Sequence, residues 1–130
     1  MKNIAILCSG GDVSGMNAAL KRFVEYSIAK GMKPFFVHDG FEGLIDDAIY
    51  EAGYKDVAGI IVNGGTKIRS SRSKRFMEEK YRRQAVENLN RHDIGYLVVL
   101  GGDGSFKGMQ KLGEESSGIG FCGIPATIDN

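Results

Sequence analysis

The sequence predicts an α/β fold with three αβα layers and a mostly parallel sheet in the middle. Two observations carry this prediction. Short, continuously apolar runs, which suit strands covered on both faces, alternate with amphipathic stretches of helical period. Many of the 19 glycines stand in clusters, and these clusters follow or end apolar runs. Alternating strands and helices indicate βαβ units, which place helices on both faces of a sheet.

The elements follow in chain order. Apolar runs predict strands over residues 4–8, 34–38, 59–62, 97–100 and 119–124. Apolar spacing of i, i+3 and i+4 predicts helices over residues 16–30, 76–90 and 107–115. Gly31 is placed to end the first helix as its C′ residue. Residues 39–54 are expected to be irregular. Such an arrangement is Rossmann-like or flavodoxin-like.

The composition limits the class of protein. A chain of 130 residues suffices for one domain. A net charge of +1 predicts no general attraction to nucleic acid or to an anionic membrane. The sequence has no apolar stretch long enough to span a bilayer and no signal-peptide layout at its start. Cys8 and Cys122 lie beside or within apolar runs, so we expect buried thiols in a reducing, cytoplasmic compartment.

Glycine-rich loops are expected to meet at one edge of the sheet. In parallel α/β sheets, ligands bind beyond the carboxyl ends of the strands. The predicted topology places there the loops of residues 9–15, 39–43, 64–72, 101–105 and 125–130. We therefore expect the functional site at this edge.

The loop Gly101-Gly102-Asp103-Gly104-Ser105 is the most informative of these. It follows an apolar strand and precedes a helix, an arrangement that exposes backbone N–H groups to an anion. A carboxylate beside a phosphate site makes chemical sense when a divalent cation bridges the two. The segment therefore predicts a nucleotide phosphate and a metal ion, with Asp103 as the metal ligand.

The first loop is less specific. It contains G-x-x-x-x-G from Gly10 to Gly15, but Met16 and Asn17 replace the lysine and hydroxyl of a P-loop. It could hold phosphate through backbone N–H groups, or it could be a plain tight turn.

The third loop, residues 64–72, combines glycine, hydroxyl and basic side chains. Arg72 could donate paired hydrogen bonds to a phosphoryl group, and Ser70 and Ser71 could add hydroxyl donors. The alternative is a solvated basic loop. A solvated helix face, not a ligand site, is expected for the basic residues Lys74, Arg75, Lys80, Arg82 and Arg83.

Other polar and sulfur-bearing residues have plainer interpretations. Asp129 could act as a general base or as a helix N-cap. His38 and His92 are expected to be structural or surface residues. Core packing is expected for the methionines at helical positions, Met16, Met77 and Met109.

Five segments together resemble the amino-terminal part of phosphofructokinases. They are GGDVSGMNAAL, HDGFEGL, GGTKIRSSR, LGGDGSFKGMQKL and GIPATIDN, in family order. The resemblance implies ATP-dependent phosphorylation of fructose 6-phosphate to fructose 1,6-bisphosphate in glycolysis. It implies that residues 1–130 form the nucleotide-binding part of a truncated phosphofructokinase N-terminal domain, without the rest of that domain and without the second domain.

The resemblance also implies roles for individual residues. Asp103 would organise Mg²⁺, Arg72 would contact the transferred phosphoryl group, and Asp129 would take the proton of the sugar 1-hydroxyl. Thr127 and Asp129 would bind the sugar phosphate. Met77 and Arg82 fall near the adenine pocket of some members. The remaining nucleotide-binding positions by resemblance are Gly11, Phe41, Ser71, Gly102, Gly104, Ser105 and Gly108.

Some positions refine the resemblance. Pyrophosphate-using relatives usually have Asp at the position of Gly104 and Lys at that of Ala126, so ATP is the expected donor. In bacterial relatives, arginines near the positions of Lys21, Glu25 and Tyr54 bind a phosphorylated allosteric effector. Because these three residues are not arginines, control by such an effector is not expected here. The parent enzyme is expected to be a homotetramer.

The 130-residue chain alone is expected to self-associate and to lack kinase activity. The alternatives are an NAD-kinase-like or lipid-kinase-like GGDG enzyme and a non-catalytic module that binds nucleotide or itself.

Overall fold

A five-stranded sheet forms the middle layer of the structure, a computed structural model that describes residues 3–9, 15–57 and 73–125. Its strand order is β3-β2-β1-β4-β5. The strands are β1 (Asn3–Cys8), β2 (Pro34–Val37), β3 (Ile49–Glu51), β4 (Ile94–Gly101) and β5 (Gly120–Pro125). All adjacent pairs are parallel except β2 with β3. The predicted α/β fold with a mostly parallel sheet is confirmed.

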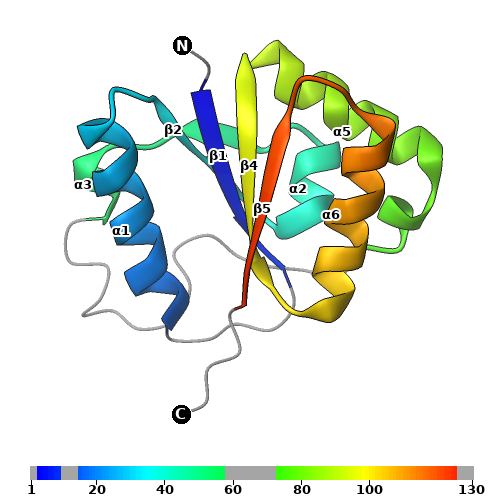
Figure 1. Cartoon of the computed structure of the whole chain (residues 1–130), viewed down its shortest axis with the longest axis horizontal. Helices are drawn as coiled ribbons and strands as arrows, with labels where there is room; N and C mark the ends of the chain where they lie inside the picture. The colour runs from blue at the N-terminus through cyan, green and yellow to red at the C-terminus, as the bar shows by residue number, and fades with distance from the viewer. Residues whose placement is uncertain (1–2, 10–14, 58–72, 126–130) are drawn as a thin grey trace.

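Helices cover both faces of the sheet (Figure 1). One face carries α1 (Gly15–Ala29) and α3 (Tyr54–Val57), and the other carries α2 (Gly40–Ile45), α5 (Glu79–Arg91) and α6 (Asp103–Glu115). Right-handed crossovers explain the division. The chain moves from β1 to β2 through α1 and from β4 to β5 through α6, in opposite directions along the sheet. The two connecting helices therefore lie on opposite faces.

Each face has its own hydrophobic core. Ile6 and Cys8 of β1 pack with Leu20 and Val24 of α1, all at most 2% exposed. The alternate residues of β1 face the larger core under α2, α5 and α6. This coverage on both sides explains why the strand reads as an unbroken apolar run. Gly31 ends α1 with a φ of 80°, as its predicted C′ position requires.

Residues 39–54 are more regular than predicted. They contain α2 and the short strand β3, joined by a turn in which Asp47 has a φ of 62°. Only Ile49 of β3 is buried, so this three-residue edge strand has no hydrophobic period that a sequence would reveal. The strand predicted over residues 59–62 lies outside the described residues.

Other boundaries differ by a few residues. The helix predicted over 76–90 is split into the 3₁₀ turn η1 (Arg75–Met77) and α5, because Glu78 between them is extended. Helix α6 begins at Asp103, four residues before the predicted start, so the glycine loop itself opens the helix.

One cysteine was predicted wrongly. Cys8 is buried as expected, but Cys122 is exposed on the edge strand β5. The two histidines have the expected structural surroundings. His92 Nε2 lies 2.8 Å from Asp47 Oδ1, and the His38 ring packs edge-on against Tyr50. No helix in residues 3–9, 15–57 and 73–125 is both long and apolar enough to cross a membrane.

Candidate functional site

The carboxyl ends of β1 and β4 bring two of the predicted loops together. Ser9 N–H, just after β1, donates to the Leu100 carbonyl at 2.8 Å. A Cβ atom on Gly101 would come within 2.9 Å of the Ser9 carbonyl oxygen. Glycine at this position therefore permits the close approach of the two backbones, and the topology places Ser9 beside the 101–105 loop as predicted.

A pocket of about 590 Å³ opens at this edge of the sheet, a size typical of small-molecule sites. Four segments contribute to it: the end of β1, helix α2, the 73–77 segment and helix α6. The lining residues are Ser9, Phe41, Ser73, Phe76, Met77, Gly102, Gly104, Ser105, Lys107, Gly108 and Lys111.

One side of the pocket is suited to an anion. Gly102 is the N-cap residue of α6, which is 13 residues long. The first N–H groups of such a helix have no carbonyl partner within it, and the helix dipole favours negative charge there. Within residues 3–9, 15–57 and 73–125, nothing beyond the adjoining chain and helix backbone lies within 4 Å of a Cβ built on Gly102 or Gly104, so these residues leave room for a ligand. Lys107 and Lys111, one turn apart on α6, add positive charge.

The other side is aromatic. Phe41 of α2 and Phe76 of η1 stack with ring centroids 4.1 Å apart and an interplanar angle of 25°. Both side chains are about 5% exposed or less. A Cβ on Gly108 would lie 3.3 Å from the Phe76 ring, so glycine allows α6 to pack closely against this pair. An apolar wall facing an anion-binding helix end suits a ligand with a planar base and phosphates.

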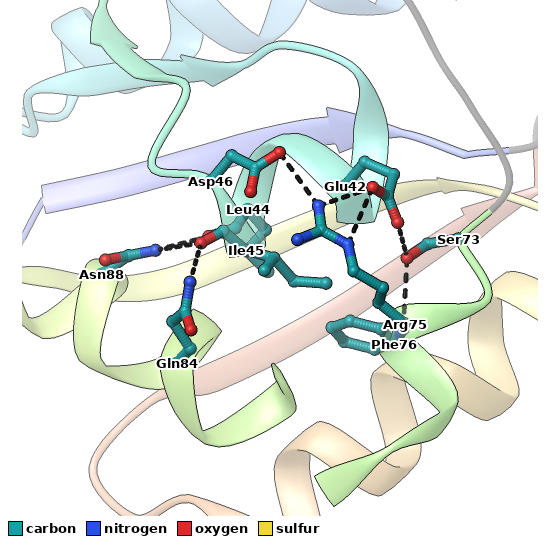
Figure 2. A network of polar contacts seen from close by, with 9 residues as sticks. All are labelled: Glu42, Leu44, Ile45, Asp46, Ser73, Arg75, Phe76, Gln84 and Asn88. Carbon is teal, nitrogen blue, oxygen red and sulfur yellow. Dashed lines mark hydrogen bonds and ion pairs between the residues drawn. The ribbon is translucent and has the colours of Figure 1, made fainter. Parts of the chain in front are cut away.

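A polar network joins α2 to the segment that carries Phe76 (Figure 2). Arg75 Nε and Nη2 donate to Glu42 Oε1 at 3.1 and 2.6 Å, and Nη2 also donates to Asp46 at 2.9 Å. The Ser73 hydroxyl donates to Glu42 Oε2. Hydrogen bonds from Arg75, and then from Ser73, hold the pKa of the Glu42 carboxyl below its usual value. Glu42 is therefore ionised at neutral pH.

Comparison with models of protein families shows which family the chain belongs to. The sequence model of the family described as Phosphofructokinase matches residues 3–130. The chain belongs to the phosphofructokinase family.

Similar sequences and structures agree with this membership. The chain is 71% identical to the ATP-dependent 6-phosphofructokinase of Sulfurovum sp. (strain NBC37-1) and 62% identical to that of Sulfurimonas denitrificans. Each match covers 100% of the chain and 40% of the relative. The chain thus spans about 40% of the length of these curated relatives.

Among solved structures, Saccharomyces cerevisiae phosphofructokinase matches 99% of the chain with a TM-score of 0.92 and 34% identity, using 20% of its own chain. A pyrophosphate-dependent phosphofructokinase from Nitrosospira multiformis matches 99% of the chain and 34% of its own with a TM-score of 0.84. Its identity is 21%, so it supports the fold alone.

Several residues expected to bind the nucleotide lie together in this phosphofructokinase-family pocket. They are Phe41, Gly102, Gly104, Ser105 and Gly108. Asp103, the expected metal ligand, is exposed at the first position of α6 and is not among the lining residues. Within the described ranges, no group of three or more His, Cys, Asp and Glu side chains could hold a metal ion. The expected residues outside the described ranges are Gly11, Ser71, Arg72, Thr127 and Asp129.

Two basic residues were wrongly expected on a solvated helix face. Arg82 is 6% exposed, donates to both carboxylate oxygens of Glu115 at 2.6 and 2.8 Å, and donates to the Phe76 carbonyl at 2.8 Å. It therefore holds the backbone of Phe76 in place and is not among the residues that line the pocket. Arg75 is half-buried in the network with Glu42. Lys74, Lys80 and Arg83 are exposed as predicted.

Met77 was expected in the core from its helical position and near the adenine pocket by resemblance, and the core expectation is wrong. It is 69% exposed at the pocket rim, because the chain is extended at Glu78 and the helical period is interrupted. Met109 packs against the core as expected.

Ser73, Phe76, Lys107 and Lys111 were not identified as site residues. For the two lysines, a signal existed in the spacing, since positions 104, 107, 108 and 111 share one helix face. Ser73 follows the predicted 64–72 loop directly, but no local pattern shows that its hydroxyl pairs with Glu42.

Proposed function

We propose that the chain forms the nucleotide side of an ATP-dependent 6-phosphofructokinase. In this proposal, residues 1–130 are the nucleotide-binding part of the amino-terminal domain. The parent enzyme transfers the terminal phosphoryl group of ATP to the 1-hydroxyl of fructose 6-phosphate, giving ADP and fructose 1,6-bisphosphate. The observation that carries the proposal is the pocket between the α6 amino terminus and the Phe41–Phe76 pair. Family membership and relatives named ATP-dependent 6-phosphofructokinase support it.

ATP, not pyrophosphate, is the proposed donor. Pyrophosphate has no base, so it would leave the apolar side of the pocket beside Phe41 and Phe76 unfilled. Gly104 lines the pocket, and no side chain of the described residues comes within 4 Å of a Cβ built there, which leaves space for the nucleotide. An aspartate at this position would put a negative charge at the helix end where phosphates bind.

Mg²⁺ is the proposed cofactor, with Asp103 as its protein ligand. The residues fit this ion: Mg²⁺ is commonly held by one or two carboxylates together with substrate phosphates and waters. Asp103 is an exposed carboxylate beside the backbone that would hold those phosphates. When bound, the ion would offset negative charge on the reacting phosphates.

The chain's own residues would orient the donor and spread its charge. Backbone N–H groups at Gly102 to Ser105 and at Gly11 would hold the phosphates, and Ser71 would add a hydroxyl donor. Phosphoryl transfer depends mainly on positioning and electrostatic stabilisation. Arg72 would stabilise charge on the transferred group. Asp129 would take the proton of the sugar 1-hydroxyl as that oxygen attacks in line, and Thr127 would help to bind the sugar phosphate.

The proposal extends to location and assembly. By resemblance, the parent enzyme is a cytoplasmic homotetramer. The 130-residue chain by itself would self-associate through a second copy, since Tyr96 and Ile124 expose apolar surface on β4 and β5, 52% and 42% respectively. Control by a phosphorylated effector is not expected, because Lys21, Glu25 and Tyr54 replace the arginines that bind such an effector in bacterial relatives.

A coupled assay tests this function. Full-length protein expressed from the gene should form fructose 1,6-bisphosphate with MgATP and fructose 6-phosphate, and much less with Mg-pyrophosphate. The 130-residue chain alone should give no measurable turnover. Faster reaction with pyrophosphate would contradict the donor assignment. Phosphorylation of NAD or diacylglycerol without phosphorylation of fructose 6-phosphate would contradict the function.

A further inference from the structure

The two edges of the sheet differ in how well they are protected. At one edge, β3 has only three residues and ends in the exposed acid Glu51. At the other edge, β5 has six residues, GFCGIP, none of which is charged and whose proline stands last. The outer N–H and C=O groups of an edge strand can pair with another chain, and short length and charged side chains discourage such pairing. From Gly120 to Ile124, β5 has neither protection.

One face of β4 and β5 exposes apolar side chains. The register pairs Val98 with Cys122 and Leu100 with Ile124, and Val98 and Leu100 belong to the core under α1. Helix α1 packs against β1 and β2, whereas α6 covers β5 on the opposite face (Figure 1). On the α1 side, Tyr96 and Ile124 are 52% and 42% exposed, and Cys122 is exposed as well.

A groove of about 400 Å³ lies on this part of the sheet. Among the described residues, none with a charged side chain lines it. Tyr96 and Cys122 line the groove together with Met32, at the entrance to β2. The uncharged edge of β5 and the apolar face beside it therefore form one continuous surface.

The Tyr96 ring lies across Gly120 of β5. The two residues are register partners, and a Cβ on Gly120 would come 2.8 Å from Tyr96 Cδ1. Glycine at this position therefore lets the ring extend over the edge strand. Ile124 lies on the same side of β5, four residues later. The strand thus has an aromatic surface near its start, an apolar side chain near its end, and Cys122 midway between them.

We propose that a second copy of the chain docks on this surface, with the two β5 strands antiparallel about a two-fold axis at Cys122. In such a contact the same surface serves both copies, so each interaction occurs twice. Opposite residues of an antiparallel pair share a face, so Ile124 would lie opposite Gly120 of the second copy and pack on that copy's Tyr96 ring. The most exposed apolar side chains of the surface would then cover each other.

The charge of the chain permits this contact. A net charge of +1 gives little repulsion between two copies, and the part of β5 that would pair is uncharged. The inference deepens the self-association included in the proposed function and does not depend on nucleotide binding.

Sedimentation equilibrium of the reduced 130-residue chain tests the inference. The wild type should have twice the mass of the monomer. Ile124→Lys should weaken dimerisation about tenfold or more, because the symmetry places two lysines in an apolar contact. Tyr50→Lys is the matched control, since it puts the same charge on the other edge strand at a residue that is 59% exposed. This control should leave the dimerisation constant unchanged.

Cys122 provides a geometric measurement. Opposite Cα atoms in an antiparallel pair are about 4.5–5.5 Å apart, which a disulfide can span. Copper–phenanthroline, which takes two electrons from a pair of thiols as two protons are released, should therefore link Cys122 of the two copies. Cys122→Ser should lose this link and still dimerise, and the buried Cys8 should not react. Hydrogen exchange in residues 120–124 should slow as the protein concentration rises.

The outcomes separate the docking surface from the rest of the account. A chain that stays monomeric at every concentration would overturn the inference and the proposed self-association, and would favour a later segment of the parent enzyme as the occupant of β5. A dimer whose affinity is unchanged in Ile124→Lys would overturn the β5 contact and leave self-association in place. Calorimetry with MgATP tests the nucleotide function separately, so neither result decides it.

Discussion

Arg82 and Glu115 form a bidentate ion pair that joins α5 to α6, with donor–acceptor distances of 2.6 and 2.8 Å. Arg82 is 6% exposed, and its guanidinium also donates to the Phe76 carbonyl. Hydrogen bonds to Glu115 raise the pKa of Arg82, and those from Arg82 lower the pKa of Glu115. The pair therefore connects the helix that opens at the pocket to the segment that carries the aromatic wall.

Breaking this pair from one side should be costly. Arg82→Met should lower the free energy of unfolding by about 2 kcal/mol, because it leaves the Phe76 carbonyl and Glu115 without their donor. Urea denaturation measures the loss. Arg83→Met, which removes an exposed arginine from the same helix, is the matched control and should change stability by less than about 0.5 kcal/mol. Equal losses for the two variants would contradict a structural role for Arg82.

The pH dependence of stability should follow Glu42 and Glu115. Both have a pKa below 4.5 in the folded protein, owing first to hydrogen bonds from Arg75 and from Arg82 respectively. A carboxyl whose folded pKa is depressed stabilises the protein above its unfolded pKa. That stability is lost as the pH falls through the folded pKa.

Thermal unfolding between pH 7 and pH 3 measures this effect. Glu42→Gln and Glu115→Gln should each lower the melting temperature at pH 7. Their differences from the wild type should shrink as the pH falls below about 4.5. Glu79→Gln, at an exposed pair, is the control. Differences that stay constant down to pH 3 would show that the carboxylate charges do not stabilise the fold.

Two glycines should respond oppositely to alanine. Gly43 lies in α2, where a Cβ would come 1.5 Å from the His38 carbonyl oxygen, so the backbone would have to move. Gly43→Ala should lower the free energy of unfolding by about 3 kcal/mol or more. A Cβ on Gly104 would meet no side chain within 4 Å in the part of the chain that the structure describes, so Gly104→Ala should leave the free chain as stable or slightly more stable.

The Gly104→Ala variant also distinguishes an effect on folding from an effect on ligand binding. Gly104→Ala should weaken MgATP binding although the protein folds, because the added methyl group would occupy the space beside the phosphates. Circular dichroism with denaturant and calorimetry measure the two effects. Undiminished binding by Gly104→Ala would indicate that the nucleotide does not approach this backbone.

Asn88 should contribute to stability through the end of α2. Its side-chain amide donates to the carbonyls of Leu44 and Ile45 at 2.8 and 2.9 Å, and the residue is 3% exposed. Asn88→Ala would remove the side-chain donor of the Leu44 carbonyl and one of the two side-chain donors of the Ile45 carbonyl, and should cost about 2 kcal/mol. Gln84→Ala removes a single, less buried hydrogen bond to the Ile45 carbonyl and should cost less. Urea denaturation measures both losses. A larger loss of stability in Gln84→Ala than in Asn88→Ala would contradict this role of Asn88.

What the sequence predicts well here depends on neighbouring residues. The run ending at Leu100 and the glycines after it predict both a buried strand and an anion-binding turn, and topology then places Ser9 beside them. Gly31 ends α1 because a positive φ suits glycine.

What the sequence did not predict depends on distant pairs. Arg82 was expected in solvent, since nothing near it in the chain indicates that Glu115, 33 residues later, lies opposite. Ser73 and Glu42 are 31 residues apart, and β3 is too short to have a period. Such features arise from tertiary packing.

Calorimetric titration with MgATP tests the central claim most directly, because it asks whether the pocket at the start of α6 holds a nucleotide and its cation. The wild-type 130-residue chain should bind MgATP at one site, and both Asp103→Ala and Gly104→Asp should abolish the binding while Ser117→Ala retains it. Absence of binding by the wild type, or equal affinity in all four proteins, would contradict the account.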